Sequence, residues 1–184
     1  MRKVLLTSAG FENTKIMDAF LEMLEVAPKN AKALFVPTAA NNADAILVLP
    51  KCLNDLINSG LKAKNISVYD LHELKTLEEI SKYHVIYFCG GSTNYLLSRM
   101  KEIGFDKELI KYVDNGGIYI GVSAGSLIAT NSIKYNLGII NCTLAVHRSK
   151  GSNCGPIDTT NCPHIELSNS QAIIITSDQC SVIE

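Results

Sequence analysis

The chain has 184 residues, which suits one domain with a substantial core, and we expect a single domain over residues 1–184. Apolar residues make up 47% and charged residues 19%, a balance that excludes a disordered chain, and the net charge of −1 excludes the basic surface that nucleic-acid binding requires. No apolar run approaches the roughly 20 residues of a membrane-spanning helix, so neither nucleic acid nor membrane is expected as a partner.

Strand-like and helix-like segments alternate from the N-terminus to about residue 131. In chain order we predict a strand at 3–8, a helix at 13–25, a strand at 31–36, a helix at 43–60 that Pro50 kinks or divides, a strand at 65–69, a helix at 77–81, a strand at 84–88, helices at 93–103 and 106–115, a strand at 118–122 and a helix from Ala124. This alternation predicts an α/β fold: a three-layer sandwich with a mostly parallel central sheet and helices on both faces.

The pattern changes after residue 131. Short strand-like segments follow at 137–140, 143–146, 165–167, 172–176 and 181–183, and glycines and prolines separate them. We expect these segments to form a short antiparallel extension of the main sheet at its C-terminal side.

A G-x-S-x-G sequence, Gly121 to Gly125, lies where the strand at 118–122 passes into a helix. This is the strand–turn–helix setting of a nucleophile elbow, in which small neighbours permit a sharp turn and expose a serine hydroxyl. Active sites of parallel sheets form beyond the carboxyl ends of the strands. The pattern therefore predicts Ser123 as a nucleophile, with the Ala124 amide beside the reacting atom.

A serine nucleophile requires a base, and four histidines are available. His72 and His84 are poorly placed along the chain, whereas His147 and His164 follow the elbow. We favour His147 because it ends an apolar stretch and begins a loop that can reach the active edge. A second oxyanion donor is expected from Gly90 and Gly91, since glycines at a strand end let their amides approach a substrate.

Six cysteines are present, and the N-terminus lacks the features of a secretion signal. We therefore expect a cytoplasmic protein with free thiols. Cys154, Cys162 and His164 are close in sequence but lack the CxxC spacing of zinc sites, so a loop that carries two thiols is favoured over a metal site. No metal and no other cofactor is expected.

Four segments together resemble the peptidase E family, the S51 serine peptidases, which include aspartyl dipeptidase and cyanophycinase. They are the glycine turn at 89–94, the serine elbow at 121–126, the approach to His147 at 137–147 and a late segment at 167–172. The resemblance implies a fold like that of class I glutamine amidotransferases. It also implies that Ser123 attacks a peptide carbonyl, that His147 is the general base and then the acid, and that the amides of Gly91 and Ala124 hold the oxyanion.

The resemblance also implies an acid beside His147 as the third member of the triad. The best-known activity of that family is cleavage after an N-terminal aspartate, which would require a cation in the pocket. For the acid, Asp158 is favoured over Glu166; for the cation, Arg148 is the candidate, with Lys150 nearby. A short peptide, such as an Asp-Xaa dipeptide, is the expected partner. An esterase, a β-aspartyl peptide hydrolase and a non-catalytic ligand-binding member stay open as alternatives, as do a monomer and a homodimer.

Overall fold

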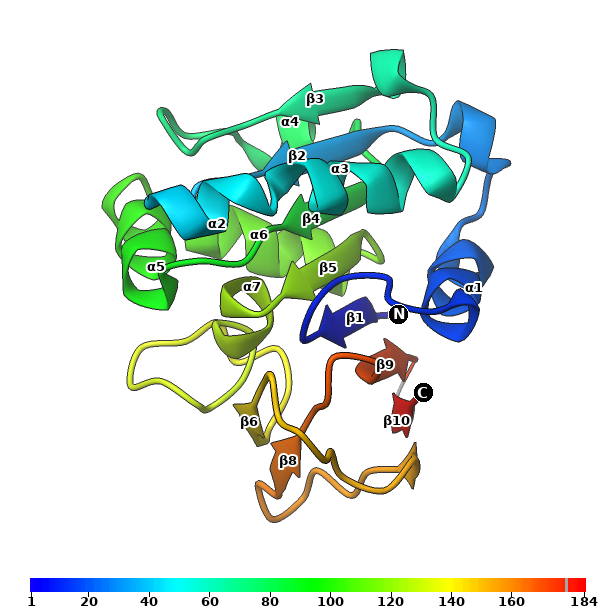
Figure 1. Ribbon diagram of the computed structural model, residues 1–184. Coiled ribbons are helices and arrows are strands. Elements are labelled where there is room, and N and C mark those ends of the chain that lie inside the picture. Colours follow the sequence, from blue (N-terminus) through cyan, green and yellow to red (C-terminus); the bar gives the residue numbers. More distant parts are fainter. Residues whose placement is uncertain (178) are drawn as a thin grey trace.

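The computed structural model describes residues 1–177 and 179–184 (Figure 1). Within this part of the chain the main sheet has eight strands in the order β3-β2-β4-β5-β1-β9-β10-β7. Its strands are β1 (Lys3–Thr7), β2 (Ala33–Val36), β3 (Ile66–Val68), β4 (Val85–Phe88), β5 (Ile118–Val122), β7 (Gly155–Pro156), β9 (Ala172–Thr176) and β10 (Gln179–Ile183). The first five strands in this spatial order are parallel, as predicted from the alternation of strands and helices.

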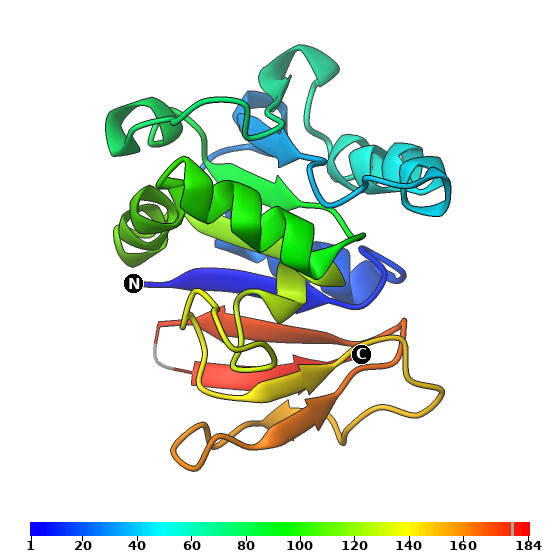
Figure 2. The same ribbon diagram turned by 90° about the vertical axis from the view of Figure 1, so that its left-hand side faces the viewer.

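Helices cover both faces of this sheet, and the two groups are separated clearly in Figure 2. The helices are α1 (Thr14–Met23), α2 (Ala43–Leu47), α3 (Leu49–Asn58), α4 (Leu77–Ile80), α5 (Thr93–Glu102), α6 (Phe105–Asp114) and α7 (Ala124–Leu127), with 3-10 turns at Pro28–Asn30 and Ala63–Asn65. The expected division near Pro50 is confirmed, because α2 ends at Leu47 and Pro50 lies in the first turn of α3.

Two hydrophobic cores lie on opposite faces of the sheet because successive strand residues point to opposite sides. Val4 and Leu6 of β1 belong to the core under α5 and α6, whereas Leu5 belongs to the core under α1 and α3. The strands are buried on both faces, which explains why they appear in the sequence as continuous apolar runs. This confirms the three-layer α/β sandwich.

The C-terminal region differs in part from the expectation. β9 and β10 extend the sheet in antiparallel fashion from β1, as expected, and the short strand β7 pairs with β10. However, β6 (Thr143–Ala145) and β8 (His164–Glu166) form a separate two-stranded sheet, and they are parallel. The expectation of an antiparallel extension is therefore wrong for these two strands, because short apolar segments do not specify their pairing partner.

The prediction of a strand at 137–140 is also wrong. This segment is irregular, and its amides donate to the carbonyl groups that end the turn after α7: Leu137 to Ile128, and both Ile139 and Ile140 to Ala129. Its three apolar side chains are buried in the core beneath α5 and α6. The apolar pattern thus reflects a buried loop. No helix in the described ranges is long and apolar enough to span a membrane.

Candidate active site

The turn from β5 into α7 holds Ser123 in a strained conformation, with φ at 48° and ψ at −103°. Both glycines of the G-x-S-x-G sequence permit this turn because neighbouring atoms lie where a side chain would begin. A Cβ on Gly121 would lie 2.6 Å from the carbonyl carbon of Gly125, and a Cβ on Gly125 would lie 2.7 Å from Cβ of Phe88. The Ser123 amide donates to the carbonyl oxygen of Thr7 at 2.9 Å, which ties the elbow to the end of β1.

His147 reaches this serine from the β6 segment. Its Nε2 lies 3.0 Å from Oγ of Ser123. The backbone of His147 also has positive φ, at 58°, which is uncommon outside glycine. Its amide donates to Oγ of Ser8 at 2.9 Å, and the Ser8 hydroxyl donates to the carbonyl oxygen of Leu167 at 3.1 Å. The buried Ser8, which follows β1 directly, therefore helps to hold this conformation.

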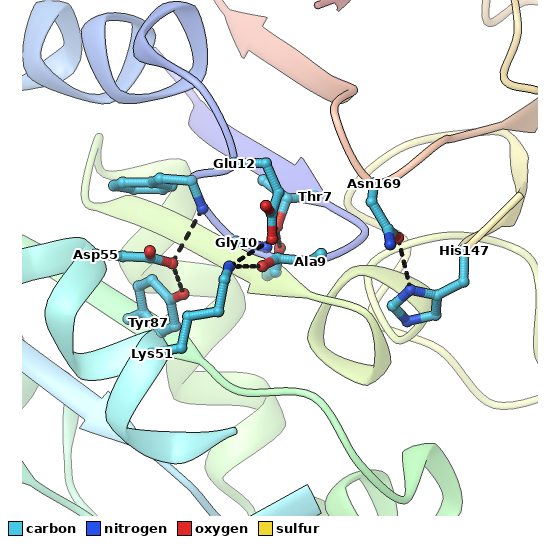
Figure 3. Close-up of polar contacts among 11 residues, drawn as sticks. Thr7, Ala9, Gly10, Glu12, Lys51, Asp55, Tyr87, His147 and Asn169 are labelled. Atoms are coloured by element: carbon cyan, nitrogen blue, oxygen red, sulfur yellow. Dashed lines mark hydrogen bonds and ion pairs between the residues drawn. The ribbon is translucent and has the colours of Figure 1, made fainter. Parts of the chain in front are cut away.

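Asn169 takes the place beside His147 that an acid was expected to fill. Its Oδ1 lies 2.9 Å from Nδ1 of His147 (Figure 3). An amide oxygen only accepts hydrogen bonds, so Nδ1 is the donor and Nε2 is free to accept from Ser123. The parallel pairing of β6 and β8 explains this contact. It places the segments that follow the two strands at the same end, and the Leu167 amide continues the pairing to the carbonyl oxygen of Ala145 at 2.8 Å.

The structure does not bring Asp158 or Glu166 to Nδ1 of His147. Asp158 is exposed and accepts from the amide of Thr160 at 2.9 Å and from its hydroxyl, which lowers the pKa of the Asp158 carboxyl. Glu166 pairs with Arg148, with Nε and Oε1 3.0 Å apart. Arg148 does not line the pocket before Ser123. Asp158, which we expected beside His147, instead accepts a hydrogen bond from the backbone two residues later, as aspartates in loops commonly do.

A pocket of about 560 Å³ opens in front of Ser123. Its lining comes from the ends of β1, β4 and β5, from α2 and α3, and from the segment after β6: Ser8, Ala9, Glu12, Asn42, Asp44, Ala45, Val48, Lys51, Cys52, Gly90, Gly91, Val122, Ser123 and His147. The pocket therefore lies at the carboxyl edge of the parallel strands, where ligand sites of such sheets are expected.

The predicted oxyanion donors line or adjoin this pocket. A Cβ on Gly90 would lie 3.2 Å from Cβ of Ser123, and Gly91 has φ at 136°. Side chains are excluded at Gly91 because a Cβ there would lie 2.1 Å from the carbonyl oxygen of Ala39. Within residues 1–177 and 179–184, no protein group accepts from the amides of Gly91 and Ala124. Both amides are thus available to a bound group.

Two side chains of α3, Lys51 and Asp55, hold one wall of the pocket in place (Figure 3). Nζ of Lys51 donates to the carbonyl oxygen of Ala9 at 2.5 Å and pairs with Oε1 of Glu12 at 2.6 Å. One turn later, the buried Asp55 accepts from the amide of Phe11 at 3.0 Å and from the hydroxyl of Tyr87 at 2.6 Å. Burial raises the pKa of Asp55, although both hydrogen bonds oppose that shift. Helix α3 therefore fixes the loop that carries Ser8 and Glu12.

The remaining candidates lie outside this site. Nδ1 of His164, the other candidate base, forms a hydrogen bond of 2.9 Å with the hydroxyl of Thr143. His72 pairs with Asp70, and His84 accepts from the Lys32 amide. All six cysteines are free thiols, as expected. No group of three potential metal ligands occurs in the described part of the chain, Cys154, Cys162 and His164 included.

Sequence reasoning missed Asn169, Ser8, Glu12 and Lys51. Asn169 lies within the 167–172 segment that contributed to the family resemblance, but an asparagine in a loop gives no signal of its distant partner. Ser8 directly follows a strand at the active edge, which is the one positional signal available. Glu12 and Lys51 are 39 positions apart and meet only in the folded chain.

Curated proteins similar to this chain are bacterial peptidases without a characterized activity. An uncharacterized peptidase of Listeria monocytogenes is 26% identical over 166 residues, which is 89% of this chain and 78% of that protein. Uncharacterized peptidases of Pasteurella multocida and Listeria innocua are 24% and 27% identical over 135 residues, or 73% of this chain. The chain spans 63% of the length of each of these two relatives.

Two crystal structures share the fold. One is a Listeria monocytogenes EGD-e protein that is named as a peptidase E. It has a TM-score of 0.77 and 22% identity, over 100% of this chain and 98% of that one. The other is a peptidase from an acI-B1 actinobacterium, with a TM-score of 0.68, 18% identity and coverage of 100% and 87%. Residues 4–174 match the profile of peptidase family S51. The chain therefore belongs to peptidase family S51.

Proposed function

We propose that this S51 family member is a serine-type peptidase that hydrolyses short peptides. The observation that carries the proposal is the contact of 3.0 Å between Oγ of Ser123 and Nε2 of His147. This distance is within the range in which a base can take the proton of a nucleophile. A non-catalytic member would have no need for this contact, nor for positive φ at both residues.

The reaction follows from the contacts of these side chains. As Oγ of Ser123 attacks the peptide carbonyl, its proton passes to Nε2 of His147, and the imidazolium keeps its Nδ1 hydrogen bond to Oδ1 of Asn169. The carbonyl oxygen gains negative charge, which the amides of Gly91 and Ala124 are available to receive. His147 then protonates the leaving amine, and a water molecule repeats the sequence on the acyl-enzyme.

Asn169 is a positioning residue in this mechanism. It keeps His147 in the tautomer that accepts from Ser123, as the acid of other triads does, but it supplies a dipole in place of a full charge. The amide–imidazole contact is compatible with serine chemistry because the orientation of the ring, which sets the Nε2 lone pair, is retained.

A fluorophosphonate probe tests the nucleophile directly. We expect covalent labelling of the wild type at Ser123, strongly reduced labelling of His147→Ala, and none of Ser123→Ala. Ser98→Ala is the matched control, because Ser98 is exposed on α5 and its hydroxyl donates only to the carbonyl oxygen of Tyr95. Equal labelling of the wild type and Ser123→Ala would exclude the proposed nucleophile.

Peptide hydrolysis is tested with a library of dipeptides and with simple esters. We expect measurable kcat/KM on dipeptides and its loss in Ser123→Ala. Higher kcat/KM on esters than on every dipeptide would replace the peptidase proposal by an esterase.

A further inference from the structure

The charged groups of the pocket before Ser123 do not suit an anionic substrate side chain. Its lining contains two carboxylates, Glu12 and Asp44, against one ammonium, Lys51. The Lys51 ammonium is already satisfied by Glu12 at 2.6 Å and by the carbonyl oxygen of Ala9 at 2.5 Å. In the described ranges Asp44 has no cationic partner, so the pocket retains an excess of negative charge.

The cation first expected to select an aspartate is engaged elsewhere. Arg148 pairs with Glu166 at 3.0 Å and does not line the pocket. Lys150 does not line it either; it lies instead in a polar groove with Ser168 and Gln171. An aspartate side chain in the pocket would therefore face the unpaired Asp44 without a free cation to balance it, and like charges at short range oppose binding.

One wall of the pocket is apolar. Ala45 and Val48, at the junction of α2 and α3, face the same space as Val122 and Ala9. Val48 is 47% exposed and therefore still has apolar surface to bury. An apolar substrate side chain would cover this wall and remove apolar surface from water.

We infer that the pocket takes an N-terminal residue with a free α-ammonium and an apolar side chain, and that it discriminates against N-terminal aspartate. Asp44 would attract the ammonium, and Ala45 and Val48 would contact the side chain. The inference rests on the proposed function in one respect: it treats this pocket as the one that holds the acyl side of the scissile bond.

Binding to the inactive Ser123→Ala protein tests the inference without turnover. The probes are the dipeptides Leu-Ala and Asp-Ala and the acetylated N-acetyl-Leu-Ala, measured by titration calorimetry. We expect Leu-Ala to bind at least about tenfold more tightly than Asp-Ala, and acetylation, which removes the charge, to weaken Leu-Ala about tenfold. Tighter or equal binding of Asp-Ala, no effect of acetylation, or no binding of all three at millimolar concentration would overturn the inference.

Two variants, each of which removes one carboxylate charge, test which residues of the pocket determine the binding preference. On the Ser123→Ala background, Glu12→Gln is expected to improve Asp-Ala binding several-fold because it releases the Lys51 ammonium, and Asp44→Asn is expected to weaken Leu-Ala several-fold. Asp18→Asn is the matched control, since Asp18 is exposed on α1 outside the pocket. Equal effects of the control and the pocket variants would assign the change to overall charge and overturn the local interpretation.

These measurements separate the inference from the proposed function. If Leu-Ala binds as expected but wild-type protein neither hydrolyses it nor reacts with the fluorophosphonate probe, the proposed function fails and the ligand class stands. If the probe labels Ser123 and Asp-Ala is the preferred ligand, the inference fails and the proposed function stands.

Discussion

Two regions build the candidate site in different ways. The elbow is made by contiguous residues: β5, the strained Ser123 and α7 follow one another, and the two glycines that permit the turn lie four positions apart. The β6–β8 pair, in contrast, joins His147 and Asn169 across 22 positions and anchors His147 to Ser8 across 139 positions. The proposed nucleophile is thus encoded locally, whereas the orientation of the proposed base depends on contacts that only the complete fold creates.

The largest predicted effect is on the proposed base. His147→Ala removes the group that we propose receives the Ser123 proton, and we expect kcat to fall by roughly 10⁴-fold, as for loss of a triad member. The melting temperature is expected to change little, because the imidazole is exposed. Steady-state kinetics on the best dipeptide, with a thermal melt in parallel, measures both. A loss of less than about tenfold would remove His147 from the mechanism.

The elbow can be broken through its packing. Gly125→Ala improves helix propensity by about 1 kcal/mol, but the new Cβ would lie 2.7 Å from Cβ and 2.8 Å from the carbonyl oxygen of Phe88. Since Phe88 is buried and its carbonyl belongs to the backbone, we expect a net destabilisation of about 1–3 kcal/mol. Urea unfolding measures this change. An increase in stability would show that the turn tolerates a side chain.

The contribution of the β6–β8 pair can be tested while His147, the proposed base, is kept. Asn169→Ala removes the acceptor from Nδ1 of His147, and we expect kcat to fall roughly 10- to 100-fold with KM little changed. Asn169→Asp keeps the acceptor and adds a charge that favours the protonated imidazole, so the rise of kcat/KM with pH is expected to move to higher pH. An unchanged pH profile in Asn169→Asp would limit Asn169 to a structural role.

The smallest effect concerns Asp55, which fixes the loop between β1 and α1. Because burial raises the pKa of Asp55 in the folded protein, the native state binds more protons than the unfolded state above the ordinary aspartate value. Stability therefore falls as pH rises toward the folded pKa, by at most about 1.4 kcal/mol per pH unit for one proton. Asp55→Asn keeps an acceptor for Phe11 and Tyr87 and is expected to lose this slope in urea unfolding at a series of pH values. A slope equal to that of the wild type would contradict the assignment.

The two regions also differ in how well they could be predicted. The elbow could be located in the sequence because a strand, a small-residue turn and a helix are adjacent, and because Gly121 and Gly125 flank the serine. His147 could be favoured among four histidines because it follows the elbow and ends an apolar stretch where a loop begins. The parallel pairing of β6 and β8 could not be predicted, since three-residue strands carry too few side chains to define a partner.

The sequence by itself determined the class of fold and the element that carries Ser123. Apolar strands buried on both faces, alternating with amphipathic helices, have few other ways to exclude water from all their apolar surface. Only the tertiary structure decided which groups surround that serine. Asn169 beside His147, Glu12 beside Lys51 and Ser8 beneath the His147 backbone are contacts between distant segments, and their polar side chains follow no periodicity that reveals a partner.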